Sequence, residues 1–413
     1  MCGIFAIFNS TLSEAELRKL MITCSSTLRH RGPDWSGYNM LPSPDGKTFS
    51  GMAHERLAIM DPDSGAQPFT SKDGNITIAA NGEIYNYKEL YASEAKEYEP
   101  QTGSDCEILL PLFAKYGSTP PLADKLRGMF SFVLHDASTN TFTAVRDHVG
   151  ITPLYIGYGN DGSIWFSSEM KAIVKHCVSL QQFPPGHMFV NGEFVRWYKP
   201  KYIVSETPIG GPLPTTPYNA SALREAFTNS VIRRMMSDVP WGVLLSGGLD
   251  SSLVASIASR HIKRKVFGGY LYFHKCPNKR EFQEETVDKL SRLYMYDCLR
   301  CNKSMSAWGV EPRVPFLDAD FLDLAMSLDP KEKMIHTKNV KPEDKRIEKW
   351  AVRKAFDTPD DPYLPDEILW RQKEQFSDGV GYGWVDSLRD AAEAEVSDIL
   401  FAQASKRFPH NTP

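Results

Sequence analysis

The sequence predicts two domains of different class, an α+β domain followed by an α/β domain. Short β-rich runs separated by turn signals fill residues 2–200, and a stretch rich in Pro, Gly and Thr follows them. After that stretch, a helix, a strand, a Gly-rich turn and another helix come in succession. A chain of 413 residues is also too long for one ordinary core. We therefore predict a first domain over 2–200, a linker over 201–218 and a second domain over 219–413.

Several strands and two helices are expected in the first domain. The predicted strands are Gly3–Phe8, Gly51–Met60, Ile76–Ala80, Met129–Asp136, Thr141–Arg146, Ile164–Ser168 and His187–Val190. The predicted helices are Ser13–Leu28, which a capping box of Ser13 and Glu16 opens, and Asp105–Tyr116. Sheets interrupted by two helices indicate layers of sheet and helix.

The second domain is predicted to begin with the helix Ala220–Ser237 and a buried strand, Trp241–Leu245. No second convincing strand follows, so this strand is expected to lack a partner, and the remainder reads as helical. Cys298 and Cys301 have zinc-ligand spacing, but no second such pair accompanies them and their surroundings read as helix. We expect no metal site there, and we expect Lys331–Lys349 to be a solvated surface stretch.

Composition narrows the class of protein. Hydrophobic residues at 42%, charged residues at 24% and a net charge of -4 describe an ordinary globular protein, without a nucleic-acid or membrane-surface partner. No run approaches the roughly 18 apolar residues of a membrane span, and the first residues do not resemble a signal peptide. Seven scattered cysteines are unlike a secreted disulfide framework. We therefore expect reduced thiols and a cytosolic location.

Cys2 is the first candidate for a catalytic residue. Removal of Met1 would give its thiol a free α-amine close by, and an α-amine with a pKa near 8 can act as the base for an adjacent nucleophile. The position alone is also compatible with a small residue near a terminus. The neighbouring motifs decide between the two interpretations.

Four motifs lie between Cys2 and Asp105 and suit a single ligand. They are Arg29-His30-Arg31-Gly32-Pro33-Asp34, His54-Glu55-Arg56-Leu57-Ala58-Ile59, Asn81-Gly82-Glu83-Ile84-Tyr85-Asn86 and Gly103-Ser104-Asp105. A guanidinium can hold a carboxylate, carboxylates can hold an ammonium, and an Asn amide with a Gly amide can form an oxyanion hole. Singly, Asn81-Gly82 also fits a hairpin turn and Arg56 a solvated charge. Together the motifs predict a site for a free amino acid with a side-chain amide.

These motifs resemble the class II glutamine amidotransferases, and more closely the glutamine-hydrolysing asparagine synthetases. The resemblance implies a four-layer αββα glutaminase domain in which Cys2 attacks the glutamine amide and releases glutamate and ammonia. It implies that Arg56 binds the substrate carboxylate, that Glu83 and Asp105 hold its ammonium, and that Asn81 and Gly82 stabilise the oxyanion. Leu57, Ile59 and Met60 complete the glutamine site that the resemblance implies.

The turn after the predicted strand of the second domain has the features of a phosphate-binding loop. Glycines let the backbone approach an anion, and amides, hydroxyls and a helix N-terminus point towards it. Without Gly-Lys-Ser/Thr this is not a Walker loop, although a plain strand-to-helix connection is the alternative. The turn looks like the pyrophosphate loop of enzymes that adenylate a substrate. The predicted ATP and pyrophosphate residues are Leu244, Leu245, Ser246, Gly247, Gly248, Leu249, Asp250, Ser251 and Ser252.

Three later segments also resemble asparagine synthetases: Phe267–Tyr270, Ala307–Asp318 and Trp370–Tyr382, in which Lys373 would contact pyrophosphate. Without the resemblance, Lys373 and Arg313 look like ordinary surface charges. Only 14 residues separate Ser252 from Phe267, where the family has further strands and helices and a Ser-Gly-Glu-Gly-Ser-Asp-Glu segment. The second domain is therefore predicted to be a truncated α/β pyrophosphate-loop domain, similar to the adenine nucleotide hydrolases.

Three functional hypotheses follow. In the first, the chain converts aspartate to asparagine with ammonia from glutamine, and ATP accompanied by Mg²⁺ is a substrate. No tightly bound cofactor or metal is expected. In the second, the missing segment leaves a glutaminase without asparagine formation, as an alternative splice form or an incorrectly joined gene model would produce. In the third, the chain is a regulatory subunit. A homodimer, or a dimer with a full-length form, is the expected assembly.

Overall fold

The structure is a computed structural model that describes residues 1–42, 46–200, 202, 211–262, 267–268, 278–335, 346–371, 390–397 and 402–404. The chain divides into two compact units. Unit 1 contains Met1–Lys199, Arg292–Arg313 and Ile399–Pro413, and unit 2 contains Pro200–Ser291 and Val314–Asp398. Lys373 and half of the predicted linker, residues 201 and 203–210, lie outside the described residues. Within the described residues, no helix is long and apolar enough to cross a membrane.

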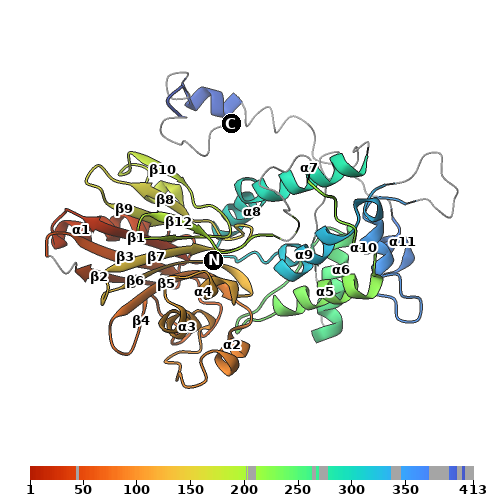
Figure 1. Cartoon of the computed structure of the whole chain (residues 1–413), viewed down its shortest axis with the longest axis horizontal. Helices are drawn as coiled ribbons and strands as arrows, with labels where there is room; N and C mark the ends of the chain where they lie inside the picture. The colour runs from red at the N-terminus through yellow and green to blue at the C-terminus, as the bar shows by residue number, and fades with distance from the viewer. Residues whose placement is uncertain are drawn as a thin grey trace. The chain divides into compact units, whose positions relative to one another are not determined.

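Unit 1 is built on two six-stranded antiparallel sheets (Figure 1). The first sheet has the order β10 (Ser179–Gln182), β8 (Tyr155–Tyr158), β9 (Ile164–Ser167), β1 (Gly3–Ser10), β3 (Phe49–Arg56), β2 (Trp35–Pro42). The second has the order β12 (Glu193–Arg196), β11 (His187–Val190), β7 (Thr141–Arg146), β6 (Gly128–Asp136), β5 (Ile76–Ile84), β4 (Phe69–Thr70).

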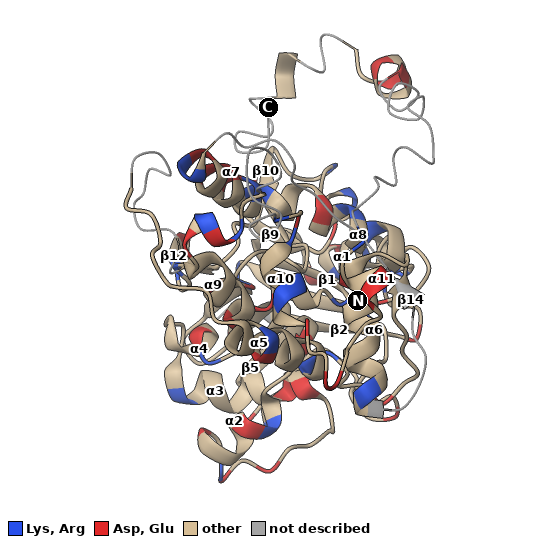
Figure 2. Ribbon diagram, turned by 90° about the vertical axis from the view of Figure 1, so that its right-hand side faces the viewer, with Lys and Arg blue, Asp and Glu red and all other residues tan. Residues whose placement is uncertain are grey.

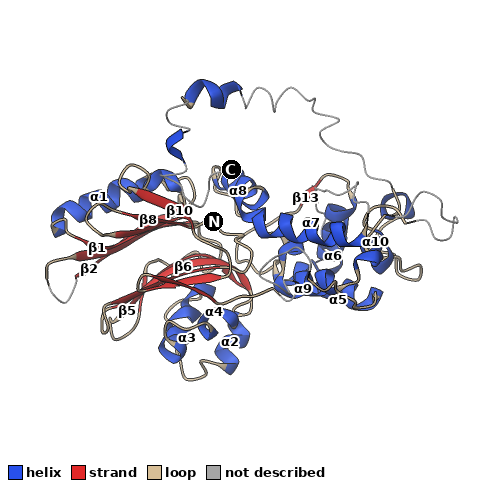
Figure 3. Cartoon of the chain, turned by 45° about the horizontal axis from the view of Figure 1, so that its top comes forward, coloured by secondary structure: helices blue, strands red, loops and turns tan. Residues whose placement is uncertain are grey.

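Helices cover the outer faces of the two sheets. Figure 3 shows α1 (Glu14–Ser26) over the first sheet, and α2 (Tyr87–Ser93), α3 (Leu109–Tyr116) and α4 (Pro121–Asp124) beneath the second. The predicted capping box is present, since the Ser13 hydroxyl accepts from the Glu16 amide and the Glu16 carboxylate accepts from the Ser13 amide. Unit 1 therefore has four layers, helix, sheet, sheet and helices.

Alternation along the strands explains the layers. On β1, Ile4, Ala6 and Phe8 pack between the sheets, whereas Phe5 and Ile7 pack on the side of α1. Successive strand residues point to opposite faces, and here both faces are covered. The run Gly-Ile-Phe-Ala-Ile-Phe is therefore apolar throughout instead of alternating with polar residues.

Most predicted elements of the first domain are present, with shifted ends. Thr141–Arg146 and His187–Val190 have the predicted bounds, but β3 ends at Arg56 and not at Met60. The predicted helix Asp105–Tyr116 divides into a 3-10 turn and α3, because Pro111 lies in the first turn of α3, where a missing N–H is tolerated. The prediction missed β2, whose Ser, Gly and Asn residues disfavour a strand and which lies at a sheet edge.

Unit 2 is mainly helical. Its helices are α5 (Ala220–Arg233), α6 (Leu249–Ile262), α7 (Lys279–Arg292), α9 (Ala319–Ser327), α10 (Trp350–Ala355) and α11 (Asp366–Leu369), where the last residue of α7 already belongs to unit 1. Phe227, Leu253, Phe321 and Phe356 belong to one buried core. Figure 2 shows acidic and basic residues on many of the described helices.

The prediction of a buried strand without a partner was wrong. β13 contains only Leu244–Leu245, and it pairs in parallel with β14, Phe267–Gly268. The connection between them contains α6, and it is long enough for the crossover that two parallel strands need. The Leu244 side chain is 71% exposed, so β13 is not a core strand among the described residues.

The charged stretch Lys331–Lys349 was also predicted incorrectly at its end. Glu348 is buried and forms an ion pair with Arg353, and Lys349 forms one with Asp250. Residues 336–345 of this stretch lie outside the described residues.

Unit 1 also contains a segment from beyond the predicted linker, Arg292–Arg313. This segment includes α8 (Asp297–Ser306), which carries Cys298 and Cys301 and confirms that their surroundings are helical. The Arg146 guanidinium lies 5.1 Å from the ring centroid of Tyr294, so the segment contacts the sheet domain directly.

Candidate active site

The facing surfaces of the two sheets bring the motif residues together. In the register of β1 and β3, Gly3 lies opposite Glu55 and Ile4 opposite His54, so Cys2 lies at the position opposite Arg56. Residues two apart on a strand point to the same face of the sheet. Cys2 therefore points in the same direction as Ile4, towards the second sheet, and Asn81 in the same direction as Ala79, towards the first. The motif residues therefore lie at one end of the surfaces by which the two sheets pack together. The other positions on these surfaces form the apolar core.

His54 connects the sheets next to this site. Its Nε2 lies 2.9 Å from the carbonyl oxygen of Ala80, which precedes Asn81. Burial lowers the pKa of His54 to about 4, so the ring is neutral at physiological pH. His54 therefore fixes the spacing of the two strands without adding a charge.

Cys2 is held by the backbone of the loop after β3 and by Arg31. The Leu57 amide lies 3.4 Å from the Cys2 sulfur, and the thiol donates to the Leu57 carbonyl at 3.6 Å. Arg31 is fully buried, donates from Nε to the Cys2 carbonyl at 2.9 Å and pairs with Glu169 at 2.9 Å. Burial raises the pKa of the Cys2 thiol. The thiol is consequently protonated at neutral pH, and its activation requires a base.

The amino terminus of the chain is buried beside this thiol. Met1 is fully buried, and its amine lies 3.7 Å from a carboxylate oxygen of Glu311. Burial lowers the pKa of this amine below its usual value, although Glu311 acts in the opposite direction. The surroundings therefore favour a neutral amine, the form that accepts a proton.

Asn81 and Gly82 have the features of an oxyanion hole. The Asn81 side chain is fully buried, and neither its amide nitrogen nor its oxygen has a partner among the described residues. Gly82 has φ +130°, and a Cβ at this position would lie 1.9 Å from the Met129 carbonyl oxygen. A buried amide without partners costs about 1–3 kcal/mol, so Asn81 is better explained by a ligand than by the fold.

Glu83 and Asp105 form a buried acidic pair. The Ile84 amide donates to Asp105 at 2.6 Å, and burial raises the pKa of Asp105 to about 7. Burial also raises the pKa of Glu83, and Glu311 and Asp105 add to this effect. The two carboxylates therefore share a site that favours an added cation.

Arg56 organises the loop in which the other predicted glutamine-binding residues lie. Its guanidinium donates to the carbonyls of Met60 and Pro62, each at 3.1 Å, and also to that of Asp61. Leu57 contacts Cys2 as described, Met60 is buried, and Ile59 lies half-buried between them. All the predicted glutaminase residues thus belong to unit 1.

The predicted pyrophosphate loop lies in unit 2 and has a compact turn. The Gly248 amide donates to the Ser246 hydroxyl at 3.3 Å, the Ser251 hydroxyl donates to the Gly248 carbonyl at 3.0 Å, and Gly247 has φ +73°. Leu244 and Leu245 form the strand before the turn, and Leu249, Asp250, Ser251 and Ser252 begin α6.

Charged side chains surround this loop. Asp250 pairs with Lys349, and Arg371 donates to the Gly247 carbonyl at 2.6 Å. The predicted role of Lys373 falls outside the described residues. Over those residues, no group of three or more His, Cys, Asp or Glu side chains could hold a metal ion.

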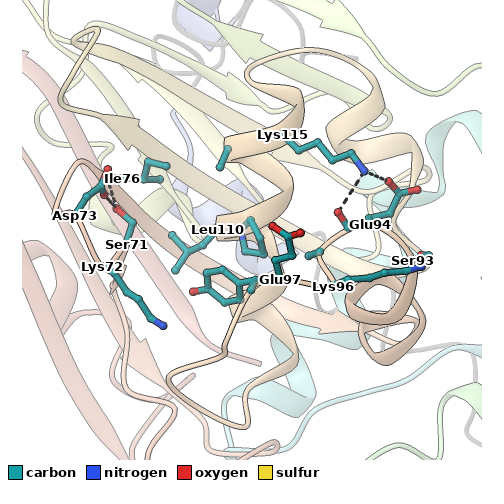
Figure 4. A pocket seen from close by; sticks show the side chains of 14 residues that line it. Ser71, Lys72, Asp73, Ile76, Ser93, Glu94, Lys96, Glu97, Leu110 and Lys115 are labelled. Atoms are coloured by element: carbon teal, nitrogen blue, oxygen red, sulfur yellow. Dashed lines mark hydrogen bonds and ion pairs between the residues drawn. The ribbon is translucent and has the colours of Figure 1, made fainter.

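A separate pocket of about 780 Å³ opens in unit 1, lined by residues that include Ser71, Lys72, Glu94, Leu110 and Lys115 (Figure 4). The ion pair between Lys115 and Glu94 borders it at 2.7 Å. None of the predicted site residues lines this pocket.

Several residues that the structure places at the site have no role that the sequence pattern predicts. Arg31 belongs to the motif Arg29–Asp34, but only the fold shows that its guanidinium contacts the Cys2 carbonyl. Arg313 looks like a surface charge only when the family resemblance is set aside, and its side chain is 14% exposed and lies 3.1 Å from Glu83. The sequence did contain a signal for these residues. Two side chains of opposite charge, Glu311 and Arg313, are separated by one residue in the segment Ala307–Asp318.

Comparison with known proteins places both domains. A model described as a glutamine amidotransferase domain matches residues 1–189, and one described as asparagine synthase matches 222–275 and 268–408. The chain is 43% identical over 510 residues to an asparagine synthetase [glutamine-hydrolyzing] of Zea mays, covering 100% of this chain and 84% of the relative. It is 42% identical over 510 residues to asparagine synthetase [glutamine-hydrolyzing] 1 of Arabidopsis thaliana, with the same coverage.

Solved structures give weaker similarities. A structure of the allosteric regulatory enzyme of purine biosynthesis has a TM-score of 0.40 and 19% identity, covering 67% of this chain and 68% of that one. A glutamine phosphoribosylpyrophosphate amidotransferase from B. subtilis complexed with ADP and GMP has a TM-score of 0.38 and 19% identity, covering 68% and 70%. At these TM-scores the assignment rests on the sequence relatives.

The alignments also locate a difference in length. They run over 510 residues, whereas this chain has 413, so positions of the relatives have no counterpart here. The asparagine synthase model matches in two parts that meet near residue 270. With full-length matches at 42–43% identity, the chain belongs to the family of glutamine-hydrolysing asparagine synthetases.

Proposed function

We propose that this chain forms asparagine from aspartate and ATP with ammonia from glutamine, and that Cys2 of unit 1 hydrolyses the glutamine. The carrying observation is that the half-buried Cys2 and the buried Asn81 and Glu83 lie on the facing inner surfaces of two sheets. An unpartnered buried amide next to a thiol and two carboxylates fits an amide substrate that carries an ammonium.

The glutaminase half-reaction begins after Met1 has been removed. The neutral α-amine of Cys2 accepts the thiol proton, and the sulfur attacks the carbon of the glutamine side-chain amide. The Asn81 amide and the Gly82 N–H donate to the oxyanion that forms. The intermediate collapses to a thioester, and the amine returns the proton to the leaving ammonia. Water then hydrolyses the thioester to glutamate.

Arg56 and the acidic pair orient the substrate. A guanidinium has five N–H donors, and the contacts described for Arg56 leave donors for a carboxylate. Glu83 and Asp105 bind the substrate ammonium. Leu57, Ile59 and Met60 supply the surrounding loop.

The synthetase half-reaction is assigned to the loop Ser246–Ser252, at the start of a truncated α/β pyrophosphate-loop domain. The amides of the turn and the N-terminus of α6, a helix of 14 residues, suit phosphate oxygens. Mg²⁺ would enter with ATP, and the Asp250 carboxylate is an oxygen ligand of the kind that Mg²⁺ accepts. Lys373 is proposed as a further phosphate ligand, and a cytosolic location stays a prediction.

One observation favours a second candidate function, a glutaminase that forms no asparagine. β13 and β14 have two residues each, Leu244 is 71% exposed, and the relatives have positions without a counterpart in this chain. Adenylation needs the nucleotide and the aspartate carboxylate positioned together, which can account for roughly 7–11 kcal/mol of a barrier.

Product assays on the purified chain separate the two functions. Glutamate, ammonia, asparagine and pyrophosphate are measured with glutamine or with ammonium chloride as nitrogen source, in the chain and in Cys2→Ala. The first proposal predicts that Cys2→Ala loses glutamate formation but keeps ammonia-dependent asparagine formation. The second predicts glutamate without asparagine or pyrophosphate from either nitrogen source. Glutamine hydrolysis that persists in Cys2→Ala would refute both assignments of Cys2.

A further inference from the structure

Two side chains from beyond the glutaminase domain are buried at the glutamine site. Glu311 is 5% and Arg313 is 14% exposed. Arg313 donates from Nε to Glu311 at 2.9 Å, and its Nη2 lies 3.1 Å from Glu83. The amine of Met1 lies 3.7 Å from Glu311 on the other side. Glu83, Glu311 and Arg313 form one buried ion cluster, which the Met1 amine borders.

The segment that carries them is anchored to unit 1 at several points. Asn302, which is buried, accepts from Arg31 at 2.9 Å, and Arg31 in turn holds the Cys2 carbonyl. A Cβ at Gly309 would lie 3.7 Å from Pro33 and 4.0 Å from Leu57, so the backbone runs close to the loop that contacts the Cys2 sulfur. Arg313 is therefore held over Glu83 by the fold of the segment.

The buried carboxylates of the cluster need the positive charge of Arg313 to stay ionised. Glu83, Asp105 and Glu311 are three carboxylates with little access to water. The groups that act on Glu83 are Glu311 and Asp105, which disfavour its ionised form, the Cys2 thiol, and Arg313, which favours it. A buried carboxylate without a paired cation takes up a proton, and a neutral carboxyl no longer attracts an ammonium strongly.

We propose that Arg313 is a positioning residue of the glutamine site: it holds the Glu83 carboxylate where the α-ammonium of the substrate binds. A segment outside the glutaminase domain thereby sets the selectivity of that domain for α-amino acids. This inference rests on the proposed glutamine hydrolysis.

The test compares Arg313→Met and Arg313→Lys with the unaltered full chain. Two substrates are used, L-glutamine and glutaramate, which is glutamine without its α-amine. In Arg313→Met the KM for glutamine should rise about 10- to 100-fold with little change in kcat, because a charge-assisted contact is weakened in both the ground and the transition state. Kinetics with glutaramate should change little, so the preference for glutamine falls by the same factor.

The pH dependence gives a second readout. Glu83 must be ionised to bind the ammonium, and Arg313 lowers its pKa. In Arg313→Met the acid limb of kcat/KM for glutamine should therefore move to higher pH, and Arg313→Lys should restore most of its position. Arg300→Met is the matched control, since Arg300 belongs to the same segment but is 67% exposed and pairs with Asp297, three residues before it.

Three outcomes would overturn the inference. A lower KM in Arg313→Met would mean that Arg313 competes with the substrate ammonium. An equal loss with both substrates, or unchanged kinetics and pH profile, would mean a structural role only. If Arg313→Met does not fold, the uncharged variant Arg313→Gln must show the same loss of glutamine preference, and an unaltered preference in Arg313→Gln refutes the proposal. Absence of glutamine hydrolysis in the unaltered chain would instead refute the proposed function.

Discussion

Replacing Asn81 by Leu should make the protein more stable and less active. Leu has the branched outline of Asn but no polar atoms, and both polar atoms of Asn81 are buried without a partner among the described residues. Removing such a group recovers its desolvation cost, about 1–3 kcal/mol in favour of folding. The same change removes one oxyanion donor, which lowers kcat about 10²- to 10³-fold.

The two effects are measured on one preparation. For a unit of 150–250 residues, each kcal/mol raises the midpoint of thermal unfolding by roughly 2–4 °C. Calorimetry should therefore show that unit 1 of Asn81→Leu unfolds at a higher temperature. Glutamate formation should almost disappear, although glutamine should still bind. Ser131→Ala, which changes the residue paired with Asn81 across the sheet, is the control and should leave kcat nearly unchanged. A joint loss of stability and activity in Asn81→Leu would show that Asn81 supports the fold, and retained activity would exclude it from the oxyanion hole.

Three further predictions concern the substrate, pH and the linker. Arg56→Ala should raise the KM for glutamine about 10- to 100-fold, because a charge-assisted pair is worth roughly 1.5–3 kcal/mol in both states, and a change confined to kcat contradicts this role. Burial raises the pKa of Asp105 to about 7, so kcat/KM for glutamine should increase as pH rises through 7, and folding stability should decrease between the unfolded pKa near 3.8 and 7. Asp105→Asn should reduce both dependences and leave the part of the acid limb that Glu83 sets, and profiles that stay the same contradict the assignment. Limited proteolysis should leave a resistant fragment that ends near the linker, 202–218, with Arg292–Arg313 still bound to it, and release of that segment on cleavage contradicts its packing in unit 1.

The motifs selected candidate site residues without their spatial arrangement. They predicted Cys2, Arg56, Asn81 and Glu83, because few other functions require these residue types so close to an N-terminal cysteine, and the structure brings these residues into unit 1. Sequence alone could not reveal that Cys2 lies opposite Arg56, since strand register depends on which strands become neighbours.

Errors occurred where tertiary contacts outweigh local pattern. Arg313 resembles a surface charge until Glu83, far away in the sequence, becomes its neighbour. β14 is only two residues long, Phe267–Gly268, and is visible as a strand only through its pairing with β13. Edge strands such as β2 tolerate polar residues because one side of their ladder is open.

The burial of Met1 has a consequence for the order of biosynthesis. In the folded chain Met1 is fully enclosed, and Asn302 and Glu311 contact it, so an aminopeptidase cannot reach it. Those residues are made about 300 positions later, and at roughly 5–20 residues per second the ribosome needs about 15–60 s to reach them. Removal of the initiator methionine therefore has a time window that closes when the later segment docks. A chain that misses this window keeps the α-amine of Cys2 in a peptide bond, so we expect its thiol to lack the base that activates it.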